Sequence, residues 1–442
     1  MTNCTTDCNP KTYKFTVLKN RKIEASFSGG SITSDGGGTL LLRQVEQKTK
    51  LLEKIASVIP DDRDPEKIKH TVLTLLAQRV FSIALGYEDL NDHNTLRKDV
   101  AFQTAINIDS ELASSPTLCR FENNATKQMI FDAHKVIVEQ FINSHKEAPS
   151  ELVLDFDATD DLVHGNQVGK FFHGYYGNYC FLPLYVFCGD ELLVAYLRPS
   201  SKDGAKHAWA ILSLLVKQFR TAWPNVKITF RGDSGFCRHQ MFDWCERKNV
   251  GYITGAAGNP RLHKLLAPAM KNAETKYNDT KEKQRIFAEF NYAAESWTRE
   301  RRIIGKAEHT ENGANPRFIV TNLVGDPQDL YDNKYCARGN MENRIKEQQL
   351  DMFADRTSCH DWWPNQFRLL LSSLAYIMVN YLRKNALSGT EFENAQVGTI
   401  RLKLFKIGAA IVKNTRRILF LLSSHCPYQV IFEHAVQALS SA

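Results

Sequence analysis

The pattern of apolar and polar positions divides the chain into three parts. From Thr39 to about Ser144, apolar residues recur at intervals of three and four, which predicts a series of amphipathic helices. From Glu151 to about residue 258, apolar runs of strand length alternate with amphipathic stretches. Beyond Lys334 the helical spacing returns, most clearly in 365–384. We therefore expect an α/β fold whose core lies between two mostly helical regions.

The central part predicts a mixed sheet. A Gly-Asp pair at 189–190 separates two apolar runs, as in a β-hairpin. Amphipathic stretches at 206–223 and 241–250 predict helices between the remaining strands. The expected strands cover 151–157, 181–188, 191–198, 226–231 and 251–257.

A further segment, 259–324, shows strand-like alternation and predicts a β-rich insertion within the core. The expected regions are a mostly helical N-terminal region (1–150), the first part of the core (151–258), the insertion (259–324), a helical second part of the core (325–390) and a basic helical C-terminal region (391–442).

Composition narrows the class of protein. The 442 residues are 43% hydrophobic and 24% charged, which excludes a disordered or collagen-like chain. No apolar run approaches the ~20 residues of a membrane span, and the first residues lack a signal-peptide pattern, so we expect a cytoplasmic protein. The ten cysteines form no CxxC pair and predict reduced thiols. A zinc site at Cys4 and Cys8, or at Cys359 and His360, would lack a second ligand pair.

Positive charge gathers in two stretches, although the net charge is only +7. Six basic residues and no acidic ones lie between Arg401 and Phe432, among them Lys413, Arg416 and Arg417. The second stretch follows Trp297 and contains Arg299, Arg301, Arg302 and Lys306. Basic residues interleaved with aromatic and aliphatic ones suit a phosphate backbone. The alternative is a solvated helix face.

Three acids stand out by their positions. Asp157 and Asp233 come at the carboxyl ends of two predicted strands, where ligands gather in open α/β sheets. Glu342 follows Tyr335 and Arg338 and precedes Lys346 at helical spacing, so these four share one helix face. Carboxylates from two strand ends and a facing helix could hold two Mg²⁺ or Mn²⁺ ions for phosphoryl transfer.

Two questions stay open at this point. Each acid taken alone could cap a turn or form a surface ion pair with Arg338 or Lys346. Asp155 points to the same side of its strand as Asp157, so it is an alternative first metal ligand. A charged pair inside an apolar run is costly unless something neutralises it, and a metal would do so.

The chain resembles the DDE transposases of bacterial insertion sequences, in particular the insertion-sequence family thirteen-eighty, a relative of family four. The family's Asp-x-Thr matches Asp157-Ala158-Thr159, and its second aspartate matches Asp233 in RGDSGF. The Tyr-x2-Arg-x3-Glu-x6-Lys signature matches Tyr335, Arg338 and Glu342, whereas Gln349 stands at the final lysine position. Lys346, one helical turn after Glu342, could take over its phosphate contact.

The resemblance implies an RNase H-like catalytic core with the acidic triad Asp157, Asp233 and Glu342 and two divalent ions. It implies an enzyme that binds the terminal inverted repeats of its element, cuts there and joins the 3′-OH to target DNA, as a homodimer on double-stranded DNA. The N-terminal helices and the basic C-terminal stretch would grip the transposon ends. In hairpin-forming relatives a tryptophan of the insertion stacks on a flipped base, and Trp297, with Arg299 and Arg301, would form such a row on a strand.

Three alternatives remain. A metal-dependent nuclease without strand transfer keeps the same acids and fold. A non-catalytic DNA-binding protein derived from a transposase would not need all three acids. A sugar hydrolase with a carboxylate pair leaves the basic stretches without a role.

Overall fold

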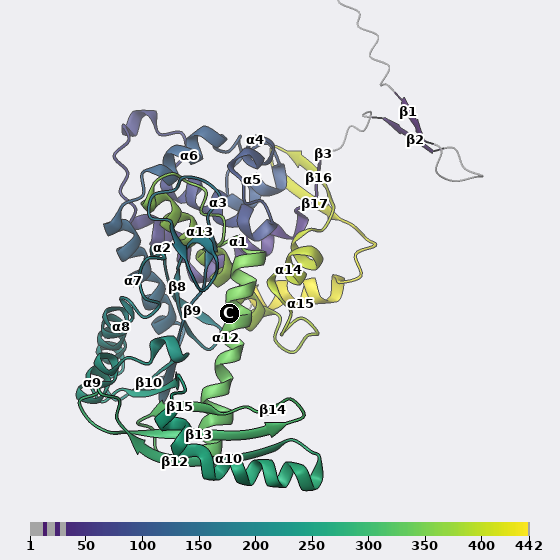
Figure 1. Ribbon diagram of the computed structural model, residues 1–442. Helices are drawn as coiled ribbons and strands as arrows, with labels where there is room; N and C mark the ends of the chain where they lie inside the picture. Colours follow the sequence, from purple (N-terminus) through teal and green to yellow (C-terminus); the bar gives the residue numbers. More distant parts are fainter. Residues whose placement is uncertain (1–11, 16–22, 27–31, 441–442) are drawn as a thin grey trace, which may run out of the picture.

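The computed structural model describes residues 12–15, 23–26 and 32–440 of the chain (Figure 1). Within them, seven α-helices fill residues 40–143, as the helical spacing predicts. These are α1 (Leu40–Thr49), α2 (Leu51–Ser57), α3 (Val72–Leu85), α4 (His93–Leu96), α5 (Val100–Ile106), α6 (Ser115–Asn123) and α7 (Lys127–Asn143). Two short strands, β1 (Thr12–Phe15) and β2 (Ile23–Ser26), pair antiparallel before them.

A nine-stranded mixed sheet forms the centre of the molecule. Its first five strands match the predicted ones. They are β4 (Glu151–Ala158), β8 (Leu184–Cys188), β9 (Glu191–Tyr196), β10 (Lys227–Gly232) and β11 (Gly251–Ala256). The order is β9-β8-β4-β10-β11; β10 is parallel to β4 and to β11, whereas β8 is antiparallel to both β4 and β9.

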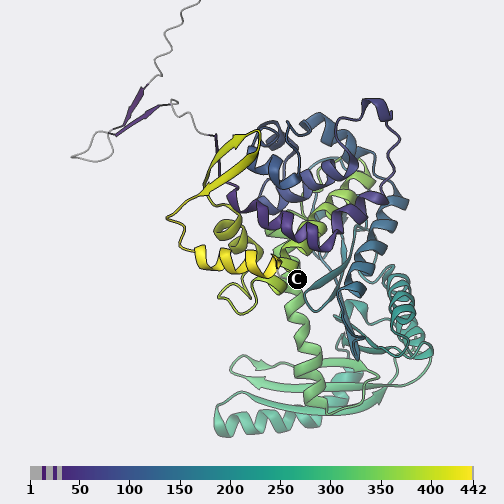
Figure 2. The ribbon, with the colours of Figure 1, turned by 180° about the vertical axis from the view of Figure 1, so that it is seen from behind.

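The two faces of this sheet are covered by different helices. Because successive side chains of a strand alternate in direction, Leu184 and Val186 of β8 pack with α8 (Ala208–Ala222) and α9 (His239–Arg247). Tyr185 and Phe187 face the opposite cluster, which contains α13 (Trp362–Ala386) and the N-terminal helices. Figure 2 shows α8 lying along the outer side of the sheet, away from α13. Because helices cover both faces of the sheet, its strands have near-continuous apolar runs.

The insertion extends the same sheet. Strands β12 (Gln284–Tyr292), β13 (Arg301–Thr310) and β15 (Arg317–Thr321) follow the order β12-β13-β15-β11, and β14 (Gly313–Ala314) pairs with β13. The prediction was wrong for its beginning, because 260–280 is the helix α10 (Pro260–Thr280). Asn259 caps this helix by accepting a hydrogen bond from the Leu262 amide at 3.0 Å. In Figure 1, α10 lies beneath the extension at the bottom of the molecule.

The second part of the core is helical, as predicted. One continuous helical segment runs from α11 (Pro327–Asp329) through the π-helix η5 (Leu330–Tyr335), the 3₁₀ turn η6 (Cys336–Arg338) and α12 (Gly339–Lys346) to the π-helix η7 (Glu347–Asp351). The long helix α13 follows, buried along most of its length against α1, α3 and β9. Single π-turns within a helix often mark functional positions.

The prediction of a helical C-terminal region was wrong for its basic part. After α14 (Val397–Ile400) and η8 (Arg401–Phe405), the chain forms an antiparallel hairpin, β16 (Ala409–Asn414) and β17 (Arg417–Leu422). β3 (Ile32–Ser34) adds a third strand to it, and α15 (Gln429–Ser440) returns to α13. A hairpin buries one face of each strand, so the alternating apolar residues of this segment form the buried face of a small sheet.

Two further features concern the whole described chain. The eight cysteines in it are free thiols, as predicted, while Cys4 and Cys8 lie outside it. Among the described residues, no helix combines the length and the hydropathy needed to cross a membrane.

Candidate active site

The register of β4 and β10 brings Asp157 and Asp233 to the same level. Phe156 lies opposite Gly232 in this parallel pair. Asp157 directly follows Phe156 in β4, and Asp233 directly follows Gly232 at the end of β10. Neighbouring strands are ~4.8 Å apart, so the two carboxylates emerge side by side. Asp233 also caps the 3₁₀ turn η4 (Ser234–Phe236) by accepting a hydrogen bond from the Gly235 amide at 2.8 Å. The sheet thus places two of the predicted acids together.

The helical segment supplies the third acid. Arg338 donates a hydrogen bond to Asp157 at 3.2 Å and forms an ion pair with Glu342 at 2.7 Å, so its guanidinium lies between these two carboxylates. The spacing of four between Arg338 and Glu342 puts both on one helix face, as predicted. Glu342 remains about half exposed, with 46% of its side chain accessible, so it can be reached from solvent.

The electrostatics of Asp157 report this gathering of acids. Burial, together with repulsion from Asp233 and Glu342, raises its pKa to about 7, even though Arg338 and the Ala158 amide oppose the rise. Like charges beside a carboxyl disfavour its ionised form, and a cation bound among them would favour that form by offsetting the repulsion. Perturbed acids of this kind are concentrated at functional sites.

Asp155 is held in a different way. Both of its carboxylate oxygens accept hydrogen bonds from the Arg231 guanidinium, and its side chain is 3% exposed. Burial raises the pKa of Asp155, and Arg231 is the main opposing group. Its charge is therefore already neutralised by a two-point contact. Of the two strand acids, Asp157 is the one beside Asp233 and Glu342.

The other residues of the predicted helix face have distinct contacts. The Tyr335 hydroxyl lies over Gly255 of β11, where a Cβ atom would come within 2.7 Å of it. Lys346 is exposed one turn beyond Glu342. Gln349, at the position where the resemblance leads one to expect lysine, donates to the Asp160 carbonyl at 3.0 Å. Gln349 thus fastens the helix to the segment that follows Asp157.

The donor chemistry fits a hard divalent cation, because all three acids offer carboxylate oxygens and no nitrogen or sulfur ligand lies among them. In 12–15, 23–26 and 32–440, however, no three His, Cys, Asp or Glu side chains stand close enough to form a ready metal site. Arg338 occupies the gap between Asp157 and Glu342. Closing the carboxylates around an ion would require Arg338 to leave that gap.

The predicted DNA-facing row of Trp297, Arg299 and Arg301 is wrong. Trp297 lies in the turn between β12 and β13, half-buried, with its ring edge-to-face against Phe242 at 5.9 Å and Tyr292 at 5.6 Å. A ring packed between two others is part of the hydrophobic core.

The arginines that follow Trp297 are neutralised by acids. Arg301 is 2% exposed and pairs with Asp243 at 2.6 Å and with Glu246 at 2.9 Å. The rest of this basic stretch is paired in the same way: Arg299 with Glu246, Arg302 with Glu289, and Lys306 with Glu308. The sequence pattern showed the cations but not their partners, which for Arg299 and Arg301 lie on the distant helix α9.

The C-terminal basic stretch is only partly available. Lys413 pairs with Asp109 at 2.5 Å, and Arg401 is buried, donating to the Ala84 carbonyl at 2.8 Å. Arg416 and Arg417 are exposed at the turn of the β16–β17 hairpin, where their amides donate to the Asn414 side chain. These two arginines are the part of the stretch best placed to meet a ligand.

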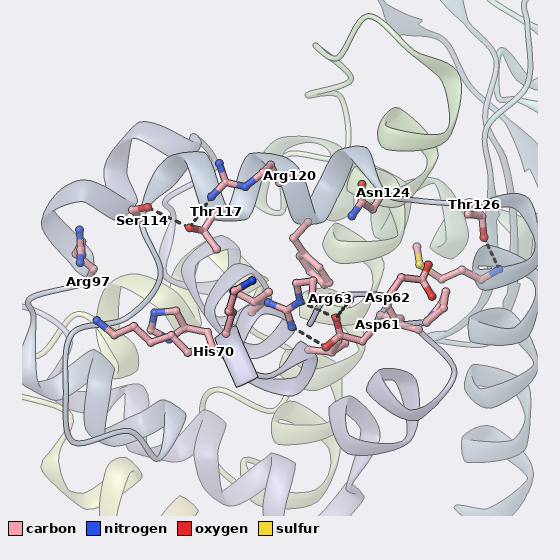
Figure 3. A pocket seen from close by; sticks show the side chains of 18 residues that line it. Asp61, Asp62, Arg63, His70, Arg97, Ser114, Thr117, Arg120, Asn124 and Thr126 are labelled. Carbon is pink, nitrogen blue, oxygen red and sulfur yellow. Dashed lines mark hydrogen bonds and ion pairs between the residues drawn. The ribbon is translucent and has the colours of Figure 1, made fainter. Parts of the chain in front are cut away.

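A cavity in the N-terminal region has no counterpart in the sequence analysis. It encloses about 710 Å³ between the start of α3 and helices α6 and α7 (Figure 3). Arg97, Arg120 and Lys69 are among its lining residues. Burial lowers the pKa of His70 in this cavity, and the nearby Lys69, Arg97 and Arg63 lower it further. The lining contains five Lys or Arg side chains and two aspartates, and three of these cations form ion pairs: Arg63 with Asp61, Lys67 with Asp64 and Arg97 with Glu111.

A family model described as "Transposase DDE domain group 1" matches residues 15–442, nearly the whole chain. The chain belongs to this family of DDE transposases. The resemblance to DDE transposases is thereby confirmed at the level of the family. A comparison of the transposase with curated proteins found no match. Among solved structures, it is similar to a piggyBac transposase, seen in a cryo-EM synaptic complex with hairpin DNA, with 9% identity over 83% of this chain and 80% of that chain and a TM-score of 0.43.

Proposed function

We propose that this transposase binds the terminal inverted repeats of an insertion sequence, cleaves the DNA at the element's ends and joins the 3′-OH to target DNA. The observation that carries the proposal is the meeting of Asp157, Asp233 and Glu342 from two strand ends and a facing helix. Membership of the DDE transposase family supports a DNA-cutting and joining activity. The finer assignment to insertion-sequence family thirteen-eighty rests on the motifs in the sequence.

The arrangement of the central strands supports an RNase H-like core. β8 and β9 continue antiparallel from one edge of β4, whereas β10 lies parallel on the other edge and β11 beyond it. This order puts the end of β4 at the middle of the sheet, where one acid from each neighbouring element can approach. Asp233 and Glu342 are 109 positions apart (342 − 233), and the segment between them includes α10 and the strands that extend the sheet.

Asp157, Asp233 and Glu342 would hold two Mg²⁺ or Mn²⁺ ions. Such ions, when bound, supply Lewis-acid activation of the attacking oxygen and stabilisation of the leaving one. In this arrangement Arg338 would turn from the carboxylates to a phosphate of the bound strand, for which its planar fork is suited. Tyr335 would fix the helix face against β11, and the exposed Lys346 would contact a second phosphate.

The DNA would extend beyond the acid site in two directions. The cationic cavity of the N-terminal helices and the exposed Arg416 and Arg417 supply positive surface for the backbone of the end DNA. Two ends must be cut together, so the active form would be a homodimer on double-stranded DNA. We place this activity in the bacterial cytoplasm, at the nucleoid.

A two-stage assay tests the proposal. A labelled duplex that carries the element's terminal repeat is incubated with the protein and Mg²⁺, and nicking at the end is measured. Pre-cut ends with a free 3′-OH are then offered together with a supercoiled target plasmid. We expect both nicking and joined products; a protein that binds the ends and yields neither would overturn the proposal.

The joining stage separates the proposed function from its rivals. A metal-dependent nuclease would nick the end but leave pre-cut ends unjoined. A DNA-binding protein without catalysis would bind the repeats in both stages and change neither substrate. The three acids at one site favour catalysis over the second rival.

A further inference from the structure

An aromatic hairpin stands at the surface directly after the acid site. Strands β6 (Phe171–His173) and β7 (Asn178–Phe181) pair antiparallel, and β5 (Asp161–Leu162) joins β7 on its other side. The exposed fractions are high for aromatic residues: 58% for Phe172, 54% for Tyr179 and 87% for Tyr175. Exposed apolar patches of this kind mark binding surfaces.

The aromatic side chains form one organised face. Phe172 and Tyr179 are cross-strand neighbours, and their rings meet edge-to-face at 5.6 Å. The Lys170 ammonium lies 5.4 Å from the centre of the Tyr179 ring. The face therefore offers two neighbouring π-surfaces with a cation at their side, a combination that suits a base and its phosphate.

The hairpin is tied to the acid site by the chain and by electrostatics. β5 begins four residues after Asp157, and Gln349 of the helical segment bonds the Asp160 carbonyl just before it. Burial, together with the charges of Asp160 and Asp157, raises the pKa of Tyr176 in the hairpin turn to about 12. The segment between Asp157 and the hairpin is thus fastened by a hydrogen bond to the helical segment that carries Glu342.

A lysine-bearing loop borders the same hairpin. Ser200 donates a hydrogen bond to the Phe171 carbonyl at 2.8 Å, and Pro199 forms a β-bridge with Phe181. The loop that continues from there exposes Lys202 and Lys206. Positive charge beside the aromatic face favours a nucleic acid over an apolar protein surface as its occupant.

We propose that the β6–β7 hairpin is a stacking platform for unpaired bases of the DNA strand engaged at the acid site. The inference rests on the proposed function and deepens it, because it states which form of DNA this surface binds. Duplex bases are stacked on each other and offer no free face, so the platform discriminates for single-stranded or frayed ends. Phe172 and Tyr179 supply the faces, and Lys170 meets the backbone beside them.

The experiment compares single-stranded and duplex DNA as ligands of the full chain. Fluorescence anisotropy measures binding of a labelled 20-nucleotide oligothymidylate and of a blunt duplex carrying the terminal repeat. The variant is Phe172→Leu with Tyr179→Leu, which keeps apolar side chains but removes the π-faces. Phe131→Leu is the matched control, because Phe131 is also an exposed aromatic, 41% accessible, and lies on α7 with a lysine, Lys135, over its ring.

We expect the double variant to lose at least about tenfold in affinity for oligothymidylate and less than about twofold for the duplex, with an unchanged Tm. The control should change neither. A second variant, Phe172→Trp with Tyr179→Trp, should retain single-strand affinity, because it restores the aromatic faces even if packing shifts.

Other results would overturn the proposal. Unchanged single-strand affinity in the leucine variant, or an equal loss on duplex, would show that the hairpin is no stacking platform. A weaker dimer in sedimentation velocity, with DNA affinity unchanged, would assign this face to a second copy of the chain. If the wild-type protein nicks and joins terminal-repeat DNA while the variants bind as it does, only this inference fails; if the wild type binds no DNA, the proposed function fails with it.

Discussion

Arg231 and Asp155 form a buried two-point ion pair across β10 and β4, and the same guanidinium donates to the Lys334 carbonyl in the π-helix η5 of the acid-bearing helical segment. One arginine thus joins both acid-bearing strands to the helix that carries Glu342. The two strand acids, only two residues apart, have different tasks: Asp155 orders the site and Asp157 lies within it.

This division predicts opposite outcomes for two neighbouring substitutions. Asp155→Ala leaves Arg231 buried without its partner and should cost about 3 kcal/mol or more of stability. Asp157→Ala removes a carboxyl whose ionised form burial disfavours, so the Tm should stay within a few degrees while DNA cleavage is lost. Thermal melts and an end-nicking assay on both variants test this. If the two variants have the same Tm and only Asp155→Ala loses nicking, then Asp155, and not Asp157, belongs to the catalytic site.

His93 predicts an acid-sensitive N-terminal region. It is fully buried, and its ring nitrogens face the Gln78 amide at 3.0 Å and the Arg79 guanidinium at 3.0 Å. Burial, with the charge of Arg79, lowers its pKa well below the usual value near 6.5. Below about pH 6.5, His93 therefore binds a proton in the unfolded chain but not in the folded chain. The free energy of unfolding consequently decreases as the pH falls.

The measurement is the Tm between pH 7.5 and 5 for wild type and for His93→Gln. The glutamine variant should be less stable at pH 7.5 and should lose less on acidification, because it has no proton to gain. Parallel curves for the two proteins would mean that other groups cause the acid sensitivity.

Trp297→Ala should weaken the fold of the insertion. Its ring packs against Phe242 and Tyr292, so truncation should lower the free energy of unfolding by about 1–3 kcal/mol. Nicking of the first strand and cleavage of the second strand should then decrease to the same extent. Trp209→Ala, at an exposed tryptophan of α8, is the control and should leave the Tm unchanged. A folded Trp297→Ala protein that is slow only in second-strand cleavage would contradict this prediction and would support a direct contact of Trp297 with DNA.

The hairpin turn at 414–417 predicts a salt-dependent contact. Arg416→Gln with Arg417→Gln should weaken binding of end duplex and lower the slope of log K against log salt by roughly two units, one for each lost phosphate contact. Lys413→Gln should change the slope less, because Lys413 is paired with Asp109. Arg247→Gln, an exposed arginine at the end of α9, serves as control. Identical slopes would remove the two arginines from the DNA path.

Much of the core could be predicted because buried strands leave a strong apolar signal. β4 and β10 end in acids that the surrounding run of Leu, Val, Ile and Phe makes conspicuous, and the spacing from Tyr335 to Glu342 identifies a helix face. The helix α10 was missed because only Leu262, Leu266 and Ala273 are buried in it, which leaves little apolar periodicity, and Pro268 interrupts the pattern.

The long-range pairings could not be predicted in the same way. Arg301 is followed by two further cations in sequence, yet Asp243 and Glu246, almost sixty residues earlier, neutralise it. The same limit applies to Asp155, whose partner lies on another strand. Sequence patterns report local periodicity, whereas the charge state of a site depends on what the fold brings beside it.

The central claim, that Asp157, Asp233 and Glu342 together form the catalytic centre, is tested most directly by single-turnover nicking of a labelled terminal-repeat duplex in Mg²⁺. Alanine at any one of the three should slow nicking at least about a hundredfold while DNA affinity stays within about twofold of wild type. The matched control is Glu147→Ala, an exposed acid outside the site. Nicking at near wild-type rate by any of the three variants would contradict the account.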